Sequence, residues 1–318
     1  MARLVIFGAV AALFFSSTFV INRMLAVGGG HWFWTATLRY AYTFVILTVI
    51  VTFRSRKHGG IYELARFFGG RLRFWVLAGG VGFAGFYSLL CFGAEFTPGW
   101  IVATSWQLTV IMTPIVLSFL GMRLATPSVV LVLLVFLGVT LVNWKGLVAL
   151  DESSYIGIAV IAVAAFCYPL GNTLLWLAEK GDHPLIEKIS HWSISDAFAR
   201  VWLMTAGALP VLVVLGIAVQ PGYPSKQQLV WVACISVSTG VIATVLFLAA
   251  RHRAKTPTEL AAVDATQSLE VPFALALEVL MLTGSFPSAL QLSGVAVVVG
   301  SVGLLAFSSA RSQKVGAG

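Results

Sequence analysis

Long apolar runs recur along the whole chain, and each is close to the length that crosses a lipid bilayer. About 20 apolar residues, at a rise of 1.5 Å each, span the roughly 30 Å hydrocarbon core. The pattern therefore predicts an all-α polytopic membrane protein with ten transmembrane helices. The runs lie at residues 4–24, 33–53, 74–94, 100–120, 127–143, 155–178, 196–219, 229–250, 260–282 and 289–308.

The stretch Ala261–Leu282 differs from the other runs because it carries Asp264, Gln267, Glu270 and Glu278. At 100° per residue, Asp264, Gln267 and Glu278 share one face of a helix, and Glu270 lies at the edge of that face. An ionised carboxylate at the centre of a membrane helix costs roughly 2.5–3.5 kcal/mol on insertion scales. Such residues need a partner, a proton or a wet cavity. We therefore interpret this helix as lining a substrate path.

The two halves of the chain share a series of matched positions. Five spans per half is an odd number, so a repeated half would enter the membrane from the opposite side, as in many secondary transporters. This pattern predicts two inverted five-helix repeats at residues 1–150 and 151–318. The matched positions are Asn22 and Asn172, His31-Trp32 and His191-Trp192, Arg39 and Arg200, Trp75 and Trp231, Gln107 and Gln267, and Pro114 and Pro272.

Composition and charge agree with a membrane class. The chain is 59% hydrophobic and 10% charged, with a mean hydropathy of +0.94, which a soluble core of this size does not require. With the N-terminus inside, the inner loops hold fifteen of the 20 Lys and Arg residues, against three in the outer loops. The positive-inside rule then predicts a cytoplasmic-membrane protein with both termini cytoplasmic. It also explains the net charge of +8 without nucleic acid as a partner.

Residues for enzymatic chemistry are scarce. The five His residues fall in loops or at span ends, and the sequence has no HExxH, GxSxG or Walker loop. The three Cys residues lie in three different apolar runs with no CxxC spacing. We therefore expect a protein that is not an enzyme and that binds no metal and no cofactor.

The polar residues inside the spans form the candidate site. Glu270 lies near mid-span and is the residue that we expect to exchange a proton, while Trp106 and Tyr168 could line the path of a cation. The buried Arg39 and Arg200 could bind an anionic group, or could lock the bundle through helix-end carbonyls or acids; Asp264 could pair with an arginine. We assign substrate and proton binding to Glu270, Gln267, Asp264, Gln107, Trp106, Tyr168 and Asn172, with Arg39, Arg200 and Glu278 as possible charge partners.

Several local sequences resemble a known family. The segment Ala265–Val271 reads ATQSLEV, and His31–Trp34, Leu38–Tyr40 and Ser105–Gln107 read HWFW, LRY and SWQ. With these motifs the chain resembles the drug/metabolite transporter superfamily, in its branch of putative multidrug-resistance efflux transporters, akin to ten-helix EamA-type exporters. The resemblance implies inverted repeats around a central cavity and export of small organic molecules. The Gly-Glu-Arg turn common in EamA-type repeats is incomplete here, at Gly121-Met122-Arg123.

These observations predict a secondary active exporter of small, cationic or amphipathic molecules, working by proton antiport and alternating access. One alternative is a proton-independent uniporter or exchanger for an anionic or zwitterionic substrate, with the acids structural. Another is a membrane enzyme or a non-transporting subunit, which the missing catalytic groups disfavour. The expected partners are the substrate, protons and the lipid bilayer. The sequence leaves open whether the protein is a monomer or a homodimer.

Overall fold

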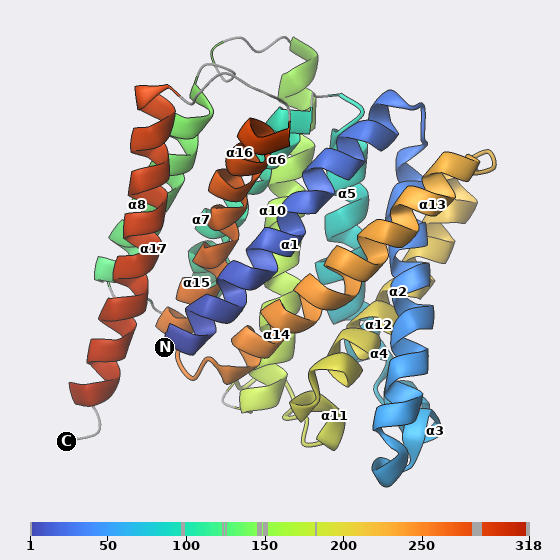
Figure 1. The fold of residues 1–318 in the computed structure, drawn as a ribbon. Helices are drawn as coiled ribbons and strands as arrows, with labels where there is room; N and C mark the ends of the chain where they lie inside the picture. The colour runs from blue at the N-terminus through green and yellow to red at the C-terminus, as the bar shows by residue number, and fades with distance from the viewer. Residues whose placement is uncertain are drawn as a thin grey trace.

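The structure is a computed structural model that describes residues 2–96, 99–122, 124, 126–144, 148, 152–181, 183–281 and 288–315. All regular structure in these ranges is helical, and each predicted apolar run coincides with a helical segment (Figure 1). The helices of the first half are α1 (Ala2–Val27), α2 (Trp32–Arg54), η1 (Arg56–His58), α3 (Gly60–Gly70), α4 (Leu72–Gly79), η2 (Gly80–Gly85), α5 (Phe86–Gly93), α6 (Gly99–Trp106), α7 (Leu108–Phe119) and α8 (Thr126–Val142). Those of the second half are α10 (Glu152–Lys180), α11 (Trp192–Ser195), α12 (Ala197–Val219), α13 (Lys226–Ile235), η3 (Ser236–Ala243), α14 (Thr244–Arg253), α15 (Pro257–Ala265), η4 (Thr266–Leu269), α16 (Glu270–Met281) and α17 (Ala289–Val315).

Five helical segments in the described ranges are long and apolar enough to cross a membrane by length and composition. Four shorter apolar helices accompany them, at 3–18, 104–119, 126–142 and 289–305. The all-helical membrane class is thereby confirmed, while the ten-span inverted repeat stays a prediction. The five segments are Trp32–Arg54, Leu72–Gly93, Ser154–Lys180, Ala197–Val219 and Lys226–Arg253.

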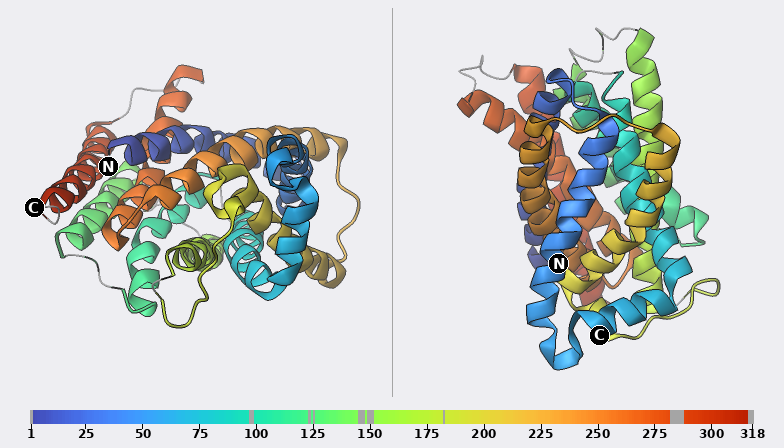
Figure 2. Two further views of the ribbon diagram at one scale, coloured as in Figure 1. Left: turned by 90° about the horizontal axis from the view of Figure 1, so that it is seen from below. Right: turned by 90° about the vertical axis from the view of Figure 1, so that its right-hand side faces the viewer.

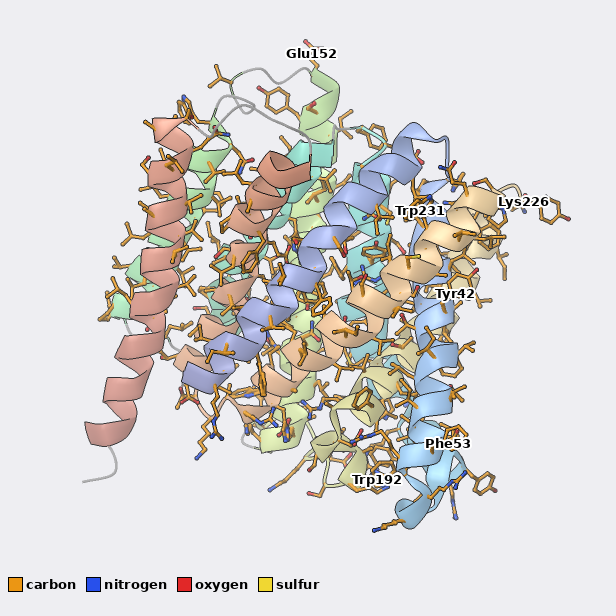
Figure 3. The ribbon with its side chains drawn as sticks, viewed as in Figure 1. Tyr42, Phe53, Glu152, Trp192, Lys226 and Trp231 are labelled. Atoms are coloured by element: carbon orange, nitrogen blue, oxygen red, sulfur yellow. The ribbon has the colours of Figure 1, made fainter. Side chains whose placement is uncertain are left out.

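The start of α1 and the end of α17 lie at one end of the bundle, which we call the terminal end (Figure 1). The amphipathic α3 and the last turns of α2, α10 and α14 lie at the same end. Figure 3 places Phe53 and Trp192 toward the terminal end, and Glu152, Lys226 and Trp231 toward the opposite end. The basic loops that the sequence predicts to be on one side therefore gather at the terminal end.

Matched histidines begin helices in both halves. The His31 side chain accepts from the N–H of Phe33 at 3.1 Å and caps α2, and His191 accepts from the N–H of Ser193 at 3.3 Å and caps α11. The predicted run 196–219 begins one residue later than expected, because Asp196 is its N-cap and accepts from Ala199 N–H at 2.9 Å. Capping side chains satisfy N–H groups that a helix start leaves without a partner.

A π-helical segment interrupts a long helix in each half. Gly80–Gly85 lies between α4 and α5, and Ser236–Ala243 lies between α13 and α14. The starts of the two segments have the same spacing along the chain as Trp75 and Trp231. Such segments leave carbonyls outside the regular α-helical ladder. Tyr40 Oη donates to the carbonyl of Phe83 at 2.9 Å, in the first of these segments.

The polar stretch 261–282 is not one continuous α-helix. A 3₁₀ turn, η4, separates α15 from α16, so the side chains rotate by more than 100° per residue across Gln267 and Ser268. Pro272 explains the break. It has no backbone N–H to donate to the carbonyl of Ser268, so a continuous α-helix would lack this hydrogen bond. At the start of a new helix, α16, a residue in the first turn needs no such donor. The single polar arc expected from the sequence is therefore divided between two helices.

Close helix packing depends on glycines at the crossing points. α8 packs against α17 at one side of the bundle, away from α2 (Figure 2). At this contact a Cβ on Gly294 would lie 2.6 Å from the carbonyl oxygen of Gly138. In the middle of the bundle, a Cβ on Gly82 would lie 2.9 Å from Gly171 Cα. Small residues at these positions let the backbones approach each other.

Gly294→Ala is expected to destabilise the protein by about 1–3 kcal/mol, because the added methyl overpacks the contact between α8 and α17. Gly300→Ala on the same helix is the matched control, since a Cβ there has no neighbour within 4 Å among the described atoms. Thermal unfolding in detergent measures both. Equal shifts for the two variants would contradict a packing role for Gly294.

Candidate functional site

A narrow cavity lies in the middle of the bundle, between segments from both halves of the chain. Its volume is about 40 Å³, room for roughly three water molecules and much less than the 300–1,000 Å³ of a typical ligand pocket. A larger ligand therefore requires the bundle to open. The cavity is lined by Phe15, Thr18, Arg39, Tyr40, Thr43, Phe83, Phe86, Tyr87, Leu90, Trp106, Tyr168, Gly240, Thr244, Gln267 and Glu270.

Glu270 is the carboxylate of this cavity. It begins α16, directly after the 3₁₀ turn, and its side chain is 1% exposed. Its carboxylate accepts a hydrogen bond from the Trp106 indole, and Arg39 is the charged group that acts on it electrostatically. No salt bridge reaches Glu270 in the described part of the chain. The carboxylate is thus buried beside a cavity and is free to take up a proton or a cation.

Arg39 is the cation of the same cavity. Its guanidinium carbon lies 4.0 Å from the centre of the Tyr87 ring, and the two side chains also share a hydrogen bond. Tyr87 Oη is held in turn by the Asn22 amide, with oxygen and nitrogen of the amide at 3.3 and 3.2 Å. Arg39 Nε has no hydrogen-bond partner among the described residues. The ring and the amide thus fix the guanidinium at the cavity wall.

Gln267 and Tyr168 form a neutral polar part of the wall. Gln267 Nε2 donates to Tyr168 Oη at 3.3 Å, and Gln267 Oε1 has no partner in the described ranges. Both side chains are at most 5% exposed. An amide oxygen without a partner can accept a hydrogen bond from a ligand or from water.

Aromatic rings cover much of the remaining wall. The Phe86 ring stacks on Trp106 with centroids 4.6 Å apart and contacts Tyr168 edge-on at 4.8 Å. Tyr40 stacks on Phe83 at 5.5 Å. Such rings bind apolar bodies through area and cations through their π faces.

Asp264 lies away from this cavity and forms an ion pair. Its Oδ1 binds Arg251 Nη1, and its Oδ2 accepts from Thr113 Oγ1 at 2.9 Å. Arg251 Nη2 also donates to Thr173 Oγ1 at 3.1 Å. The ion pair and its threonines thereby connect α7, α10, α14 and α15. Asp264 thus has the arginine partner that the sequence offered as an alternative to substrate binding.

Arg200, Asn172 and Gln107 were also predicted, and they do not line the cavity. Arg200 Nε donates to the carbonyl of Ile194 at 2.9 Å, and Arg200 Nη1 donates to that of Leu248 at 2.7 Å, so this arginine makes the predicted contacts to carbonyls. Asn172 donates to the carbonyl of Tyr168 at 2.9 Å. Gln107 is 1% exposed, and its amide has no hydrogen-bond partner among the described residues. The side chain of Glu278 lies outside the described residues.

Several wall residues were not among the sequence-predicted site residues. Thr18, Thr43 and Thr244 come from α1, α2 and α14, and Phe86 follows the first π segment. Isolated threonines and phenylalanines in apolar runs give no sequence signal, because they are common on any membrane helix. Among the missed residues, Tyr40 could most easily have been predicted from the sequence, since it follows Arg39 directly.

The wall combines one carboxylate, one guanidinium, an amide and threonine hydroxyls with aromatic rings. This set can bind an organic molecule by its charge and by its apolar body. It contains no His or Cys, and the described residues include no cluster of three metal-ligating side chains.

Comparisons with known proteins give matches over nearly the whole chain. Residues 2–313 match the EmrE family, described as "Putative multidrug resistance efflux transporter". Uncharacterized protein YjlA of Bacillus subtilis (strain 168) is 32% identical over 325 residues, covering 96% of this chain and 95% of its own length. An uncharacterized 42.1 kDa protein of Shouchella clausii, from the intracellular alkaline protease 3' region, is 32% identical over 285 residues, covering 84% and 70%.

A solved structure titled "Crystal structure of protein" is also similar. It superimposes with a TM-score of 0.63 over 96% of this chain and 97% of its own, at 14% sequence identity. At this level of identity the likeness shows that the fold is shared.

Proposed function

The chain belongs to the putative multidrug resistance efflux transporter family, and we propose that it is a secondary active exporter of small cationic or amphipathic molecules, driven by proton antiport. A transporter family agrees with the lack of enzyme motifs in the sequence. The proposal adds the substrate charge, the coupling ion and the direction of transport to the family assignment.

The position of Glu270 carries this proposal. It is a buried carboxylate at a cavity wall, bound by the Trp106 indole and by no salt bridge in the described ranges. One carboxylate can hold either a proton or an organic cation at a given moment. Exclusive occupancy is sufficient to couple the two fluxes, provided that the cavity opens to one side at a time. Gln267 and Tyr168 would orient the bound molecule.

Alternating access fits a bundle built from two inverted five-helix repeats, at residues 1–150 and 151–318. The matched histidine caps and the equally spaced π segments support the repeat. The basic loops at the terminal end support a cytoplasmic-membrane orientation with both termini cytoplasmic. In this proposal the two repeats move against each other around the cavity.

Arg39 supports a second candidate function. A guanidinium at the same wall could bind an anionic or zwitterionic substrate, and Glu270 would then serve only to balance its charge. The protein would be a proton-independent uniporter or exchanger.

Proton release on substrate binding distinguishes the two functions. Adding a lipophilic cation such as tetraphenylphosphonium to the purified protein in weakly buffered detergent should release a proton to the solution, because the cation displaces it from Glu270. Glu270→Gln should release none. Binding of the cation without proton release in the wild type would exclude antiport at this carboxylate.

A further inference from the structure

The cavity that holds Glu270 also holds a fixed positive charge, which binding of a simple cation does not explain. Arg39 is 5% exposed, and its guanidinium lies against the Tyr87 ring at the cavity wall. Like charges repel strongly at low dielectric, so a positively charged ligand alone would bind against this arginine. Arg200, its matched residue in the second half, instead donates to carbonyls and lies away from the cavity. Only one of the two matched arginines, Arg39, therefore lines the cavity.

Besides Gln267, three side chains of the cavity wall carry a polar atom without a partner in the described ranges. Arg39 Nε, Thr43 Oγ1 and Thr18 Oγ1 lack a hydrogen-bond partner among the described residues, and all three side chains line the cavity. Buried polar groups in proteins are nearly always hydrogen-bonded, so a ligand that enters when the bundle opens could supply the missing partners. Thr43 follows Arg39 by four residues on α2, which places both side chains on one face of that helix. A guanidinium and a hydroxyl on one face are suited to a carboxylate or another oxyanion.

The charges of the cavity agree with a ligand that carries both signs. With Glu270 ionised, the carboxylate and the Arg39 guanidinium balance each other. A bound monovalent cation would leave one net positive charge in a low-dielectric interior, and a bound anion would leave one net negative charge. A zwitterion would leave the cavity neutral and would give each protein charge a partner.

We propose that the substrate is a zwitterion whose anionic group binds Arg39 and Thr43, whose cationic group binds Glu270, and whose apolar body lies against Phe86, Trp106 and Tyr168. This inference rests on the proposed function for the role of Glu270, and it replaces a purely cationic substrate by one that carries both charges. Arg39 then selects the substrate, while Glu270 couples binding to the proton.

Three probes with the same apolar body test the proposal: phenylalanine, phenylalanine amide and N-acetylphenylalanine. At about pH 6, where the free amine of the amide is protonated, they are a zwitterion, a cation and an anion. Isothermal titration calorimetry on the full chain in detergent measures their dissociation constants. Phenylalanine should bind at least about 10-fold more tightly than either derivative, because only it makes both charge-assisted contacts.

Variants of Arg39 separate selection from a structural role. Arg39→Gln should weaken phenylalanine binding by about 10- to 100-fold and leave binding of the amide equal or tighter. Arg39→Lys keeps the charge and should recover part of the lost affinity. Thermal unfolding of each variant verifies that the fold persists. Equal weakening of all three probes by Arg39→Gln would assign the arginine a structural role and overturn the proposal.

The remaining outcomes distinguish a failure of substrate selection by Arg39 from a failure of proton antiport at Glu270. If phenylalanine amide binds the wild type as tightly as phenylalanine, substrate selection by Arg39 is overturned. If tetraphenylphosphonium binds and releases a proton while phenylalanine does not bind, the zwitterion inference fails and the proposed antiport stands. If phenylalanine binds best but no probe releases a proton, the selection by Arg39 stands and the proposed antiport fails.

Discussion

Asp264→Asn is expected to lower the free energy of unfolding by about 3–5 kcal/mol, because it leaves the Arg251 guanidinium buried without a counter-charge. Both side chains of this ion pair are 2% exposed, so water cannot replace the lost partner. The substitution also affects Thr113 and Thr173, which bind the two members of the pair. Thermal or denaturant unfolding in detergent measures the effect.

Glu270→Gln is the matched control, since it also neutralises one buried carboxylate but breaks no salt bridge in the described ranges. Its loss of stability should be smaller than that of Asp264→Asn, because Arg39 lies on the Tyr87 ring and forms no salt bridge with Glu270 in the described ranges. The double variant Asp264→Leu with Arg251→Met should recover most of the lost stability, because apolar residues of similar volume can replace a buried ion pair. If Asp264→Asn is as stable as Glu270→Gln, the ion pair is not what holds these four helices together.

Transport should depend more on Glu270 than on Asp264, the reverse of the order expected for stability. Glu270→Gln is expected to reduce proton-driven accumulation of tetraphenylphosphonium by about 10- to 100-fold, the range for losing one charge-assisted contact. The amide cannot exchange a proton, and it offers the cation no charge. The assay uses inverted membrane vesicles with an imposed pH gradient.

Glu187→Gln provides a control for charge alone. This carboxylate is 80% exposed and pairs with Arg71 at 3.2 Å at the surface, so transport should stay near the wild-type rate. Full proton-driven accumulation by Glu270→Gln would exclude this carboxylate as the coupling site. Together, the stability and transport measurements assign separate roles to Asp264 and Glu270.

The helices themselves were predictable from the sequence, because apolar runs of membrane length have few alternatives in a bilayer. The observed ends of the run 33–53 differ from the expected ones by a single residue on each side, at Trp32 and Arg54. The sequence showed His31 and His191 as matched positions, but their roles as N-caps of α2 and α11 came from the structure.

The geometry of the polar stretch could not be predicted in the same way. A helical wheel assumes a constant rotation per residue, and the 3₁₀ turn at Thr266–Leu269 breaks that assumption. Glu270 consequently lines the cavity, while Asp264 pairs with Arg251 elsewhere. Pro272 indicated an irregular backbone but not which carboxylate would face the cavity.

The partners of Arg39 and Arg200 could not be predicted from the sequence either. Arg39 and Arg200 hold matched positions, yet one lies on an aromatic ring and the other donates to two carbonyls. The difference arises largely from helices that are distant in sequence, namely α5, which holds Tyr87, and α14, which holds Leu248. Such contacts depend on tertiary packing and leave no local pattern.

The two π segments also bear on how the sequences of relatives can change. A π turn contains one residue more than an α turn, so a helix can gain or lose a residue there without any change in its loops. The loss of one residue from Gly80–Gly85 would restore α geometry and rotate the following side chains by about 100°. Tyr87 would then turn away from Arg39. When a relative is aligned with this chain, a one-residue gap in either π segment therefore indicates that different side chains line the cavity. It does not indicate a tolerated change in loop length.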